Sequence, residues 1–358
     1  MAVHTGLVTT LREPRDKILR FVNYHLNVGI DHILLFLDEG EPPPALLGDP
    51  RVTVTRCDPE HWRQARRQLE EGPLRALRDC DGRRYRAALR QLGGASLDHQ
   101  VKQYLNASLA LGRARSLGLD WLFHVDGDEL IHVREGRLGA EMAGVPDGVD
   151  WVVFSTLEAV PHAAVQGDGF TEVGVFRDVS RPTWASSPPL DRLLARACGA
   201  AHASLAWLAG CRETFFRGAY FRGHAYGKSA ARTRSPIVGL HLHRPVARGP
   251  LRVRRSRRGR ILHFDCITYE GWVAKWAGRY EGDRARPHRR RAARAAQGEA
   301  FIRPYADGSE AALRALYARL YFVPERQRGR LFALGLLRRI SLPPELFLPG
   351  PRPGPTGG

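Results

Sequence analysis

Two hydrophobic patterns alternate along the chain. Short apolar or alternating runs, each with the length of a β-strand, occupy residues 4–10, 31–40, 51–57, 120–125 and 150–158. Apolar residues with helical spacing occupy residues 16–29, 60–95 and 98–118. The order strand, helix, strand, strand, helix, strand, strand predicts an α/β fold, in which helices flank a mostly parallel, twisted sheet.

The strand predicted over residues 120–125 is followed by three carboxylates within four residues, those of Asp126, Asp128 and Glu129. Carboxylates this close repel one another unless the turn is fully solvated or a cation lies among them. In sheets of this class, ligands bind beyond the carboxyl ends of the strands. Asp126 and Asp128 are therefore candidate ligands of one hard cation, Mn²⁺ or Mg²⁺, and a solvated turn without metal is the alternative.

The pattern divides the chain into three regions. Residues 1–245 carry the α/β pattern and predict the core domain. Residues 246–345 are basic and predict a mainly helical region that completes or flanks the site, with helices over 312–325 and 328–340. Residues 346–358 are rich in proline and glycine and predict a disordered tail.

The net charge of +18 favours anionic partners. The 55 basic residues include only four lysines, which are Lys17, Lys102, Lys228 and Lys275. Arginine runs occupy 252–260 and 284–296, and they predict either contact with an anionic membrane or glycan, or a solvated surface that reflects GC-rich coding. Nucleic acid is an unlikely partner, because the chain has no recognisable binding motif or aromatic platform.

The remaining composition indicates a cytoplasmic protein. The five cysteines are scattered and form no CxxC pair, which argues against a disulfide framework and fits a reducing compartment. The first residues lack the pattern of a signal peptide, and no stretch approaches the ~20 apolar residues of a membrane span. With the basic runs, these features extend the prediction to peripheral contact with the inner face of the membrane.

Four segments of the chain carry the motifs of one protein family. The first is "LVTTLREPRDKILRFVNYHLNVGIDHILLFLDEGE", which includes the pair Tyr24-His25, and the second is "QVKQYLNASLALGRARSLGLDWLFHVDGDELI". The two later segments are "GHAYGKSAARTRSPIVGLHLHRP" and "ILHFDCITYEGWVAKW". Together they resemble bacterial glycosyltransferase family 2-type proteins and the related family 92. The resemblance covers roughly residues 1–280 and implies a GT-A fold.

The resemblance implies a transferase that moves a sugar from a nucleotide-sugar donor, such as a UDP-sugar, to a glycan, lipid or other hydroxyl acceptor in bacterial surface polysaccharide synthesis. The implied donor-binding residues are Thr10, Arg12, Glu13, Asp38, Asp126 and Lys228. The implied metal ligands are Asp126 and Asp128, with His243 and His263 as the histidines of the C-terminal part. A metal-dependent phosphohydrolase and a non-catalytic polyanion-binding protein are the alternatives.

An inverting transferase also needs a general base that deprotonates the acceptor hydroxyl. Glu158, at the predicted end of the strand over 150–158, is the first candidate, and Asp191 is its rival.

Overall fold

The structure is a computed structural model. It describes residues 3–94, 97–134, 137–161, 167–178, 227–285, 300–323 and 325–350, together with the isolated positions 165, 193 and 197. The chain forms two compact units. Unit 1 comprises Met1–Phe154, Gly227–Ile261 and Pro344–Gly358, and unit 2 comprises Ser155–Tyr226 and Leu262–Pro343.

The sheet of unit 1 contains the predicted parallel strands. These are β1 (Thr5–Leu11), β2 (His32–Leu37), β3 (Val52–Arg56) and β4 (Trp121–His124), in the order β3-β2-β1-β4. β1 pairs in parallel with both of its neighbours, so that Leu11 lies opposite Leu37 and Val8 lies opposite His124. The carboxyl ends of these strands therefore meet at one edge of the sheet.

The sheet is mixed, because antiparallel pairs follow beyond β4. β8 (Lys228–Arg232) pairs antiparallel with β4, and the first part of β6 (Trp151–Ala159) pairs antiparallel with β8. β5 (Glu129–Val133) pairs with β11 (Val253–His263), and β9 (Ile237–Leu240) forms a hairpin with β10 (Pro245–Ala247). The expected parallel arrangement therefore holds for β3-β2-β1-β4, while β8 and β6 add antiparallel pairs.

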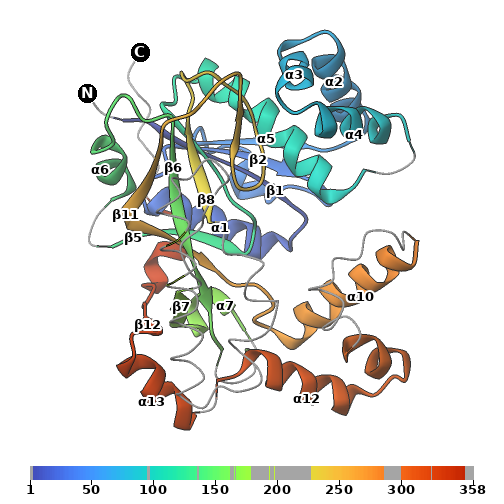
Figure 1. Cartoon of the computed structure of the whole chain (residues 1–358), viewed down its shortest axis with the longest axis vertical. Helices are drawn as coiled ribbons and strands as arrows, with labels where there is room; N and C mark the ends of the chain where they lie inside the picture. The colour runs from blue at the N-terminus through green and yellow to red at the C-terminus, as the bar shows by residue number, and fades with distance from the viewer. Residues whose placement is uncertain are drawn as a thin grey trace. The chain divides into compact units, whose positions relative to one another are not determined.

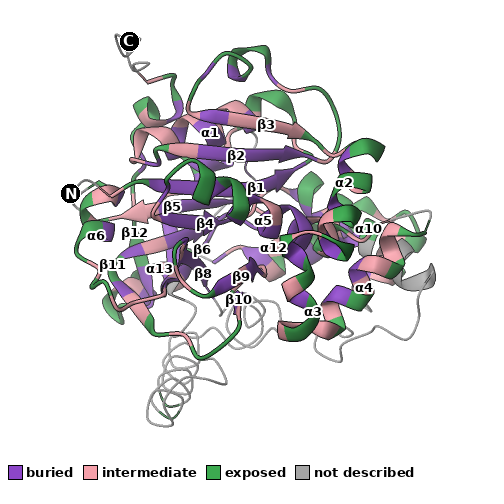
Figure 2. Cartoon of the chain, turned by 90° about the horizontal axis from the view of Figure 1, so that it is seen from above, coloured by how far each residue is buried: buried purple, intermediate pink, exposed green. Residues whose placement is uncertain are grey.

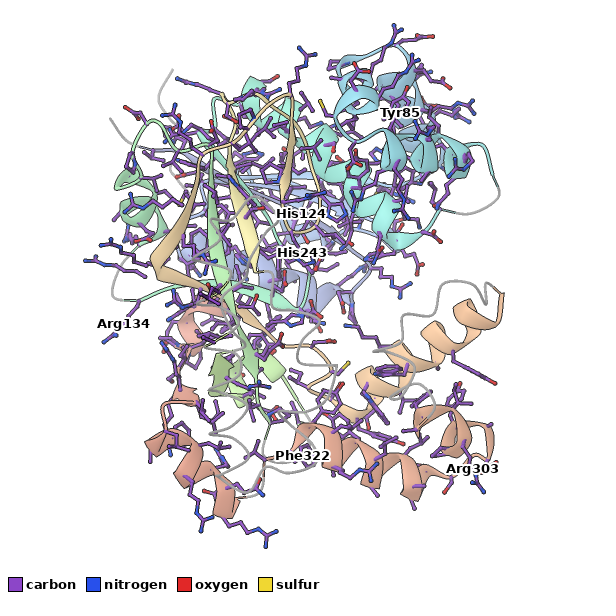
Figure 3. The ribbon with its side chains drawn as sticks, in the orientation of Figure 1. Tyr85, His124, Arg134, His243, Arg303 and Phe322 are labelled. Carbon is purple, nitrogen blue, oxygen red and sulfur yellow. The ribbon has the colours of Figure 1, made fainter. Side chains whose placement is uncertain are left out.

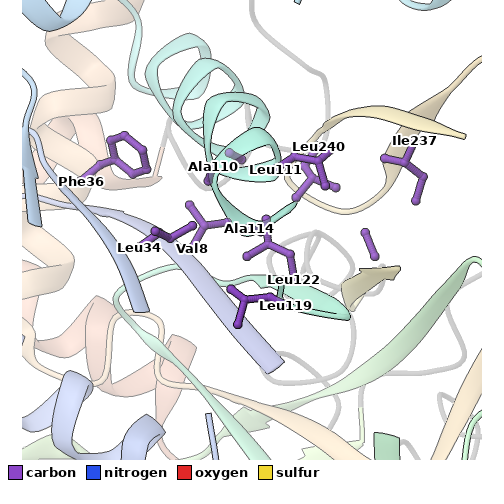
Figure 4. Close-up of a cluster of buried hydrophobic side chains, with 12 residues drawn as sticks. Val8, Leu34, Phe36, Ala110, Leu111, Ala114, Leu119, Leu122, Ile237 and Leu240 are labelled. Atoms are coloured by element: carbon purple, nitrogen blue, oxygen red, sulfur yellow. The ribbon is translucent and has the colours of Figure 1, made fainter. Parts of the chain in front are cut away.

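Helices cover the sheet of unit 1. They are α1 (Arg15–Asn27), α2 (Pro59–Glu70), α3 (Leu77–Cys80), α4 (Gly82–Leu92), α5 (His99–Ser116) and α6 (Leu138–Ala143), with short 3-10 turns at Pro44–Leu46 and Pro73–Ala76 (Figure 1). α5 packs Ala107, Ala110, Leu111 and Ala114 against Val8, Leu34 and Leu122 (Figure 4). The central strands are buried, whereas α2, α3 and α4 carry exposed faces (Figure 2).

The Tyr24-His25 pair of α1 holds the strand that follows the acidic turn. The Tyr24 hydroxyl donates to the carbonyl oxygen of Ile131 at 3.1 Å, and His25 Nε2 accepts from the Ile131 amide at 3.3 Å. Both side chains are completely buried. The pair that carries the family resemblance therefore satisfies both backbone groups of one residue of β5.

Unit 2 combines short strands with helices. β7 (Val175–Asp178) pairs antiparallel with residues 157–159 of β6 and with β12 (Leu337–Arg339). The helices in its described part include α7 (Gly169–Glu172), α10 (Tyr269–Ala285), α12 (Glu310–Tyr321) and α13 (Glu325–Ala333). An aromatic cluster that includes Trp272, Trp276, Phe301 and Tyr317 fills the space around α10 and α12.

The region predicted as mainly helical departs from that expectation in two places. The arginine run 252–260 forms most of the strand β11. Within it Ser256 and Gly259 are buried, whereas Arg257 and Arg258 are exposed. The helix expected over 328–340 ends at Ala333, since Gly335 takes a positive φ of 66° and the chain continues as β12. Of the second arginine run, residues 286–296 lie outside the described part.

The predicted disordered tail begins with an ordered turn. Pro344–Phe347 forms a 3-10 turn, and the Phe347 ring stacks on Tyr24 at a centroid distance of 5.2 Å. Phe347 is only 3% exposed, because α1 offers it an aromatic surface. Residues 351–358 lie outside the described part. Among the described helices, none combines the length and apolar character needed to cross a bilayer.

Candidate functional site

One face of α5 contacts the carboxyl ends of three neighbouring strands. Lys102 Nζ donates to Asp38 Oδ1 at 2.5 Å, just beyond β2. Gln103 Nε2 donates to Asp126 Oδ1 at 2.6 Å, beyond β4, and Asn106 Nδ2 donates to Thr10 Oγ1 at 3.1 Å in β1. The predicted donor-binding residues Thr10, Asp38 and Asp126 therefore share one helix as their support.

The acidic turn contains a buried cation supplied by the protein. Lys228, at the start of β8, is 1% exposed, and its Nζ lies 2.6 Å from Asp126 Oδ2 and 3.0 Å from Glu129 Oε2. Glu129 Oε2 also accepts from the backbone amide of Asp126 at 2.8 Å. Two of the three carboxylates therefore share a single ammonium group, and Asp128 lies between them in sequence at intermediate exposure.

This ion network shifts the pKa values of both partners. Burial raises the pKa of Asp126, but the charge of Lys228, its hydrogen bond and the nearby His124 together outweigh burial and hold that pKa well below its usual range. The charge of Asp128 opposes this effect in part. Burial lowers the pKa of Lys228, yet Asp126 and Glu129 outweigh burial and raise it above the usual range. Asp126 and Lys228 are therefore both charged at neutral pH.

The end of β1 lies close against the acidic turn. A Cβ atom built on Gly127 would lie 2.7 Å from Leu11 Cδ2 and 3.4 Å from Glu13 Cγ, so a larger residue at this position would displace one of them. Glu13 forms an ion pair with Lys17 at 3.0 Å, and Arg12 is exposed. Glu13 and the acidic turn are therefore neighbours, as the donor-site prediction requires.

Two histidines of unit 1 lie near this edge (Figure 3). His124, at the end of β4, is buried, and neither of its ring nitrogens makes a hydrogen bond of normal geometry within the described residues. Burial, followed by the charge of Lys228, lowers the pKa of His124 to about 4, so the ring is neutral at pH 7. His243, a predicted metal ligand, has its Nδ1 3.0 Å from the carbonyl oxygen of Gly227.

The other predicted site residues belong to unit 2. Glu158 and His263 form a buried pair, with 2.8 Å between Glu158 Oε2 and His263 Nδ1. Glu158 is the next-to-last residue of β6, and its second oxygen, Oε1, has no hydrogen-bond partner among the described residues. A predicted base and a predicted metal ligand thus contact each other. Asp191 lies outside the described residues.

Sequence reasoning missed four residues that complete the cluster. Lys102, Gln103 and Asn106 support the strand ends, and Glu129 shares Lys228. The sequence offers one sign of the three residues of α5: they are polar, although most of the neighbouring buried positions of this helix are apolar. Glu129 belongs to the acidic run in the sequence, and its burial follows from its place at the start of β5.

Part of the chain is similar to known proteins. No protein-family profile matches the sequence. Two glycosyltransferase-like proteins of Arabidopsis thaliana are 40% and 34% identical to it, each over 80 residues. Each alignment covers 22% of this chain and only 18% or 16% of the relative. The chain is thus glycosyltransferase-like by partial similarity.

Proposed function

We propose that the chain is a glycosyltransferase that uses a nucleotide-sugar donor and binds it at the carboxyl edge of β3-β2-β1-β4. The observation that carries the proposal is the cluster of Thr10, Asp38 and Asp126 at this edge, all supported by α5. Ligands of open α/β sheets bind at such edges. The partial similarity to glycosyltransferase-like proteins selects sugar transfer among the reactions that such a site serves.

The charge of the acidic turn fits a divalent cation. The carboxylates of Asp126, Asp128 and Glu129 outnumber the Lys228 ammonium by two negative charges. Among the described residues, no group of three or more His, Cys, Asp or Glu side chains is arranged to hold a metal ion. The surplus of carboxylate charge is the observation that suits Mn²⁺ or Mg²⁺ bound by one or two carboxylates together with substrate phosphates.

In this proposal Asp126 and Asp128 hold the metal ion, and His243 is the predicted histidine ligand that belongs to unit 1. When bound, the ion supplies positive charge to the diphosphate that leaves the sugar. The chain itself orients the Asp126 carboxylate through Gln103 and Lys228, so that little of its motion has to be lost on binding. Asp38 and Thr10 are proposed to contact the nucleoside, with Lys102 fixing the Asp38 carboxylate.

Glu158 is proposed as the base that takes the proton of the acceptor hydroxyl. His263 Nδ1 lies 2.8 Å from one oxygen of Glu158 and can orient the carboxylate, while the other oxygen is without a partner in the described part of unit 2. A buried carboxylate with one oriented and one available oxygen suits proton abstraction. Glycan, lipid and other hydroxyl compounds remain the proposed acceptors.

The deciding experiment is to incubate the full chain with a panel of nucleotide sugars, with Mn²⁺, with Mg²⁺ and with EDTA. We expect release of nucleoside diphosphate from one donor, and this release should need a divalent cation. Release of free inorganic phosphate from every nucleotide would instead indicate a phosphohydrolase. Binding of polyanions without any turnover would indicate a non-catalytic protein, and either result would overturn the proposal.

The arginines of β11 are proposed to contact an anionic membrane surface. Arg257 and Arg258 are exposed, and within the described residues their side chains make no hydrogen bond or ion pair. Juxtaposed basic side chains of this kind are attracted to the anionic lipids of a membrane surface. Such contact would hold the enzyme near a lipid-linked acceptor.

A further inference from the structure

The placement of the four lysines stands out in a chain whose basic residues are otherwise arginine. Every lysine forms an ion pair with a carboxylate. The pairs are Lys17 with Glu13, Lys102 with Asp38, Lys228 with Asp126 and Glu129, and Lys275 with Asp265. Glu13, Asp38 and Asp126 follow the neighbouring strands β1, β2 and β4. Lysine therefore occurs where carboxylates gather at the ends of adjacent strands.

Lysine and arginine are not interchangeable at such places. An ammonium is a compact point charge that two carboxylates can share, whereas a guanidinium is a planar fork that pairs best with one. Lys228 makes use of this property, because its Nζ contacts both Asp126 and Glu129 and its side chain is 1% exposed. Lys228 thus occupies the inner side of the acidic turn as a permanent cation.

We propose that Lys228 is a built-in counter-ion that prevents the acidic turn from retaining a divalent cation by itself, so that the metal ion binds only together with an anionic donor. The inference rests on the proposed function, since the donor and metal are those of that proposal. It assigns Lys228 as a positioning residue, in place of the direct phosphate contact that the family resemblance implies.

The reason is competition for the same carboxylates. Both oxygens of Asp126 already accept hydrogen bonds, from Gln103 at 2.6 Å and from Lys228 at 2.6 Å, and Lys228 lies 3.0 Å from Glu129. A metal ion that approaches without donor finds one of the two negative charges of Asp126 and Glu129 offset by the nearby ammonium and has to compete with it for their oxygens. A diphosphate adds negative charge and oxygen ligands on the outer side of the turn, and so makes the ion's binding favourable.

The test is Mn²⁺ binding to the purified full chain, measured by the electron paramagnetic resonance signal of free Mn²⁺, without nucleotide and then with UDP as the probe diphosphate. The wild type should bind Mn²⁺ weakly alone and on the order of tenfold more tightly with UDP. Lys228→Gln should bind Mn²⁺ alone on the order of tenfold more tightly than the wild type. Glu129→Gln should move in the opposite direction, because Lys228 then serves Asp126 alone.

Controls separate this effect from loss of structure. Lys275→Gln removes a lysine from its pair with Asp265 and should leave Mn²⁺ affinity unchanged. If Lys228→Gln melts at a lower temperature, Mn²⁺ should raise its melting temperature more than that of the wild type, since a ligand that binds the folded state stabilises it. A merely structural role of Lys228 would produce no such gain.

Two results would overturn the inference. One is a Lys228→Gln protein that binds Mn²⁺ no more tightly than the wild type and gains no thermal stability from it. The other is a wild type that binds Mn²⁺ equally tightly with and without UDP. Tighter Mn²⁺ binding by Lys228→Gln would support the counter-ion role. If the wild type at the same time released no nucleoside diphosphate from any nucleotide sugar, that result would count against the proposed function alone.

Discussion

At the scale of single residues, the acidic turn depends on an interaction between distant parts of the chain. Asp126 and Lys228 are 102 positions apart and meet at 2.6 Å. The sequence predicted that both belong to the donor site, because both match motifs of one family. It did not predict that they would bond to each other, since the spacing of motifs carries no information about which side chains meet after folding.

Asp128 lies between Asp126 and Glu129 in the acidic turn and is partly exposed. Asp128→Asn keeps the shape of the side chain and removes its charge. We expect Mn²⁺-dependent binding of the nucleotide sugar to be lost while the melting temperature is retained. Titration of donor in Mn²⁺ and in EDTA measures this, with Asp147→Asn, at another exposed carboxylate, as the control. Undiminished turnover with Mn²⁺ would show that Asp128 is no metal ligand.

Glu158 allows donor binding and chemistry to be separated. Glu158→Gln keeps the side chain's size and a hydrogen-bond acceptor for His263, but it removes the base. We expect transfer to slow by ~10²–10⁴, the usual contribution of a general base, with unchanged affinity for the nucleotide sugar. Asp126→Asn, in contrast, should weaken both.

Steady-state rates and donor titrations on the two variants give this comparison. Transfer by Glu158→Gln at the wild-type rate would place the base elsewhere, and Asp191 would be the next residue to substitute. Loss of donor affinity in Glu158→Gln would instead make Glu158 part of donor binding.

At the scale of elements, the hydrophobic pattern predicted most helices and strands of unit 1 but not their polar contacts. The helix expected over 98–118 is α5, and Gly118 ends it with a positive φ of 69°. Its role in supporting Thr10, Asp38 and Asp126 depends on which helix face meets the sheet, and periodicity reveals only that the face is apolar. β11 was missed as a strand because arginine dominates its exposed positions.

The contact of α1 with β5 makes stability depend on pH. Burial lowers the pKa of His25 from 6.5 to about 3, which outweighs the opposing hydrogen bond to Phe21, and Tyr24 beside it stays neutral because burial raises its pKa. Between pH 3 and 6.5, His25 is therefore protonated in the unfolded chain and neutral in the folded chain. Stability is complete above this window and falls as the pH decreases through it, by up to about 1.4 kcal/mol per pH unit.

His25→Gln provides the test, because glutamine can accept the Ile131 amide hydrogen bond without titrating. We expect the free energy of unfolding of this variant, measured with urea from pH 4 to 6.5, to fall less steeply with decreasing pH than that of the wild type. His4→Gln, at an exposed position, is the matched control. Equal slopes for His25→Gln and the wild type would mean that His25 is not held neutral in the fold.

At the scale of the whole molecule, the sequence predicted the α/β class and the place of the candidate site. It did not predict how the chain divides into two compact units. Unit 1 is built from three separate stretches of sequence, and two of the four boundaries between the units fall inside β6 and β11. Composition shows only continuous regions, so it cannot reveal that residues 344–350 return to α1. The Tyr24–Phe347 stack that secures this return joins residues far apart in the chain.

The surplus of positive charge supplies the prediction that belongs to the molecule as a whole. If the arginines of β11 hold the protein on anionic lipid, then replacing Arg254, Arg255, Arg257 and Arg258 with glutamine should lower binding to liposomes rich in anionic lipid. Basic residues near such a surface contribute about 1 kcal/mol each, so the loss should be on the order of 10²-fold or more at low salt. It should shrink as salt is added, because the Debye length is only ~10 Å at 0.1 M.

Replacement of Arg63, Arg66 and Arg67 in α2, which pair with Glu60 and Glu70, is the control and should change binding far less. Hydrolysis of a soluble donor should survive in the β11 variant, since the substitution leaves the strand ends of the candidate site intact. Unchanged liposome binding with impaired donor hydrolysis would assign these arginines to the catalytic site instead of to a membrane.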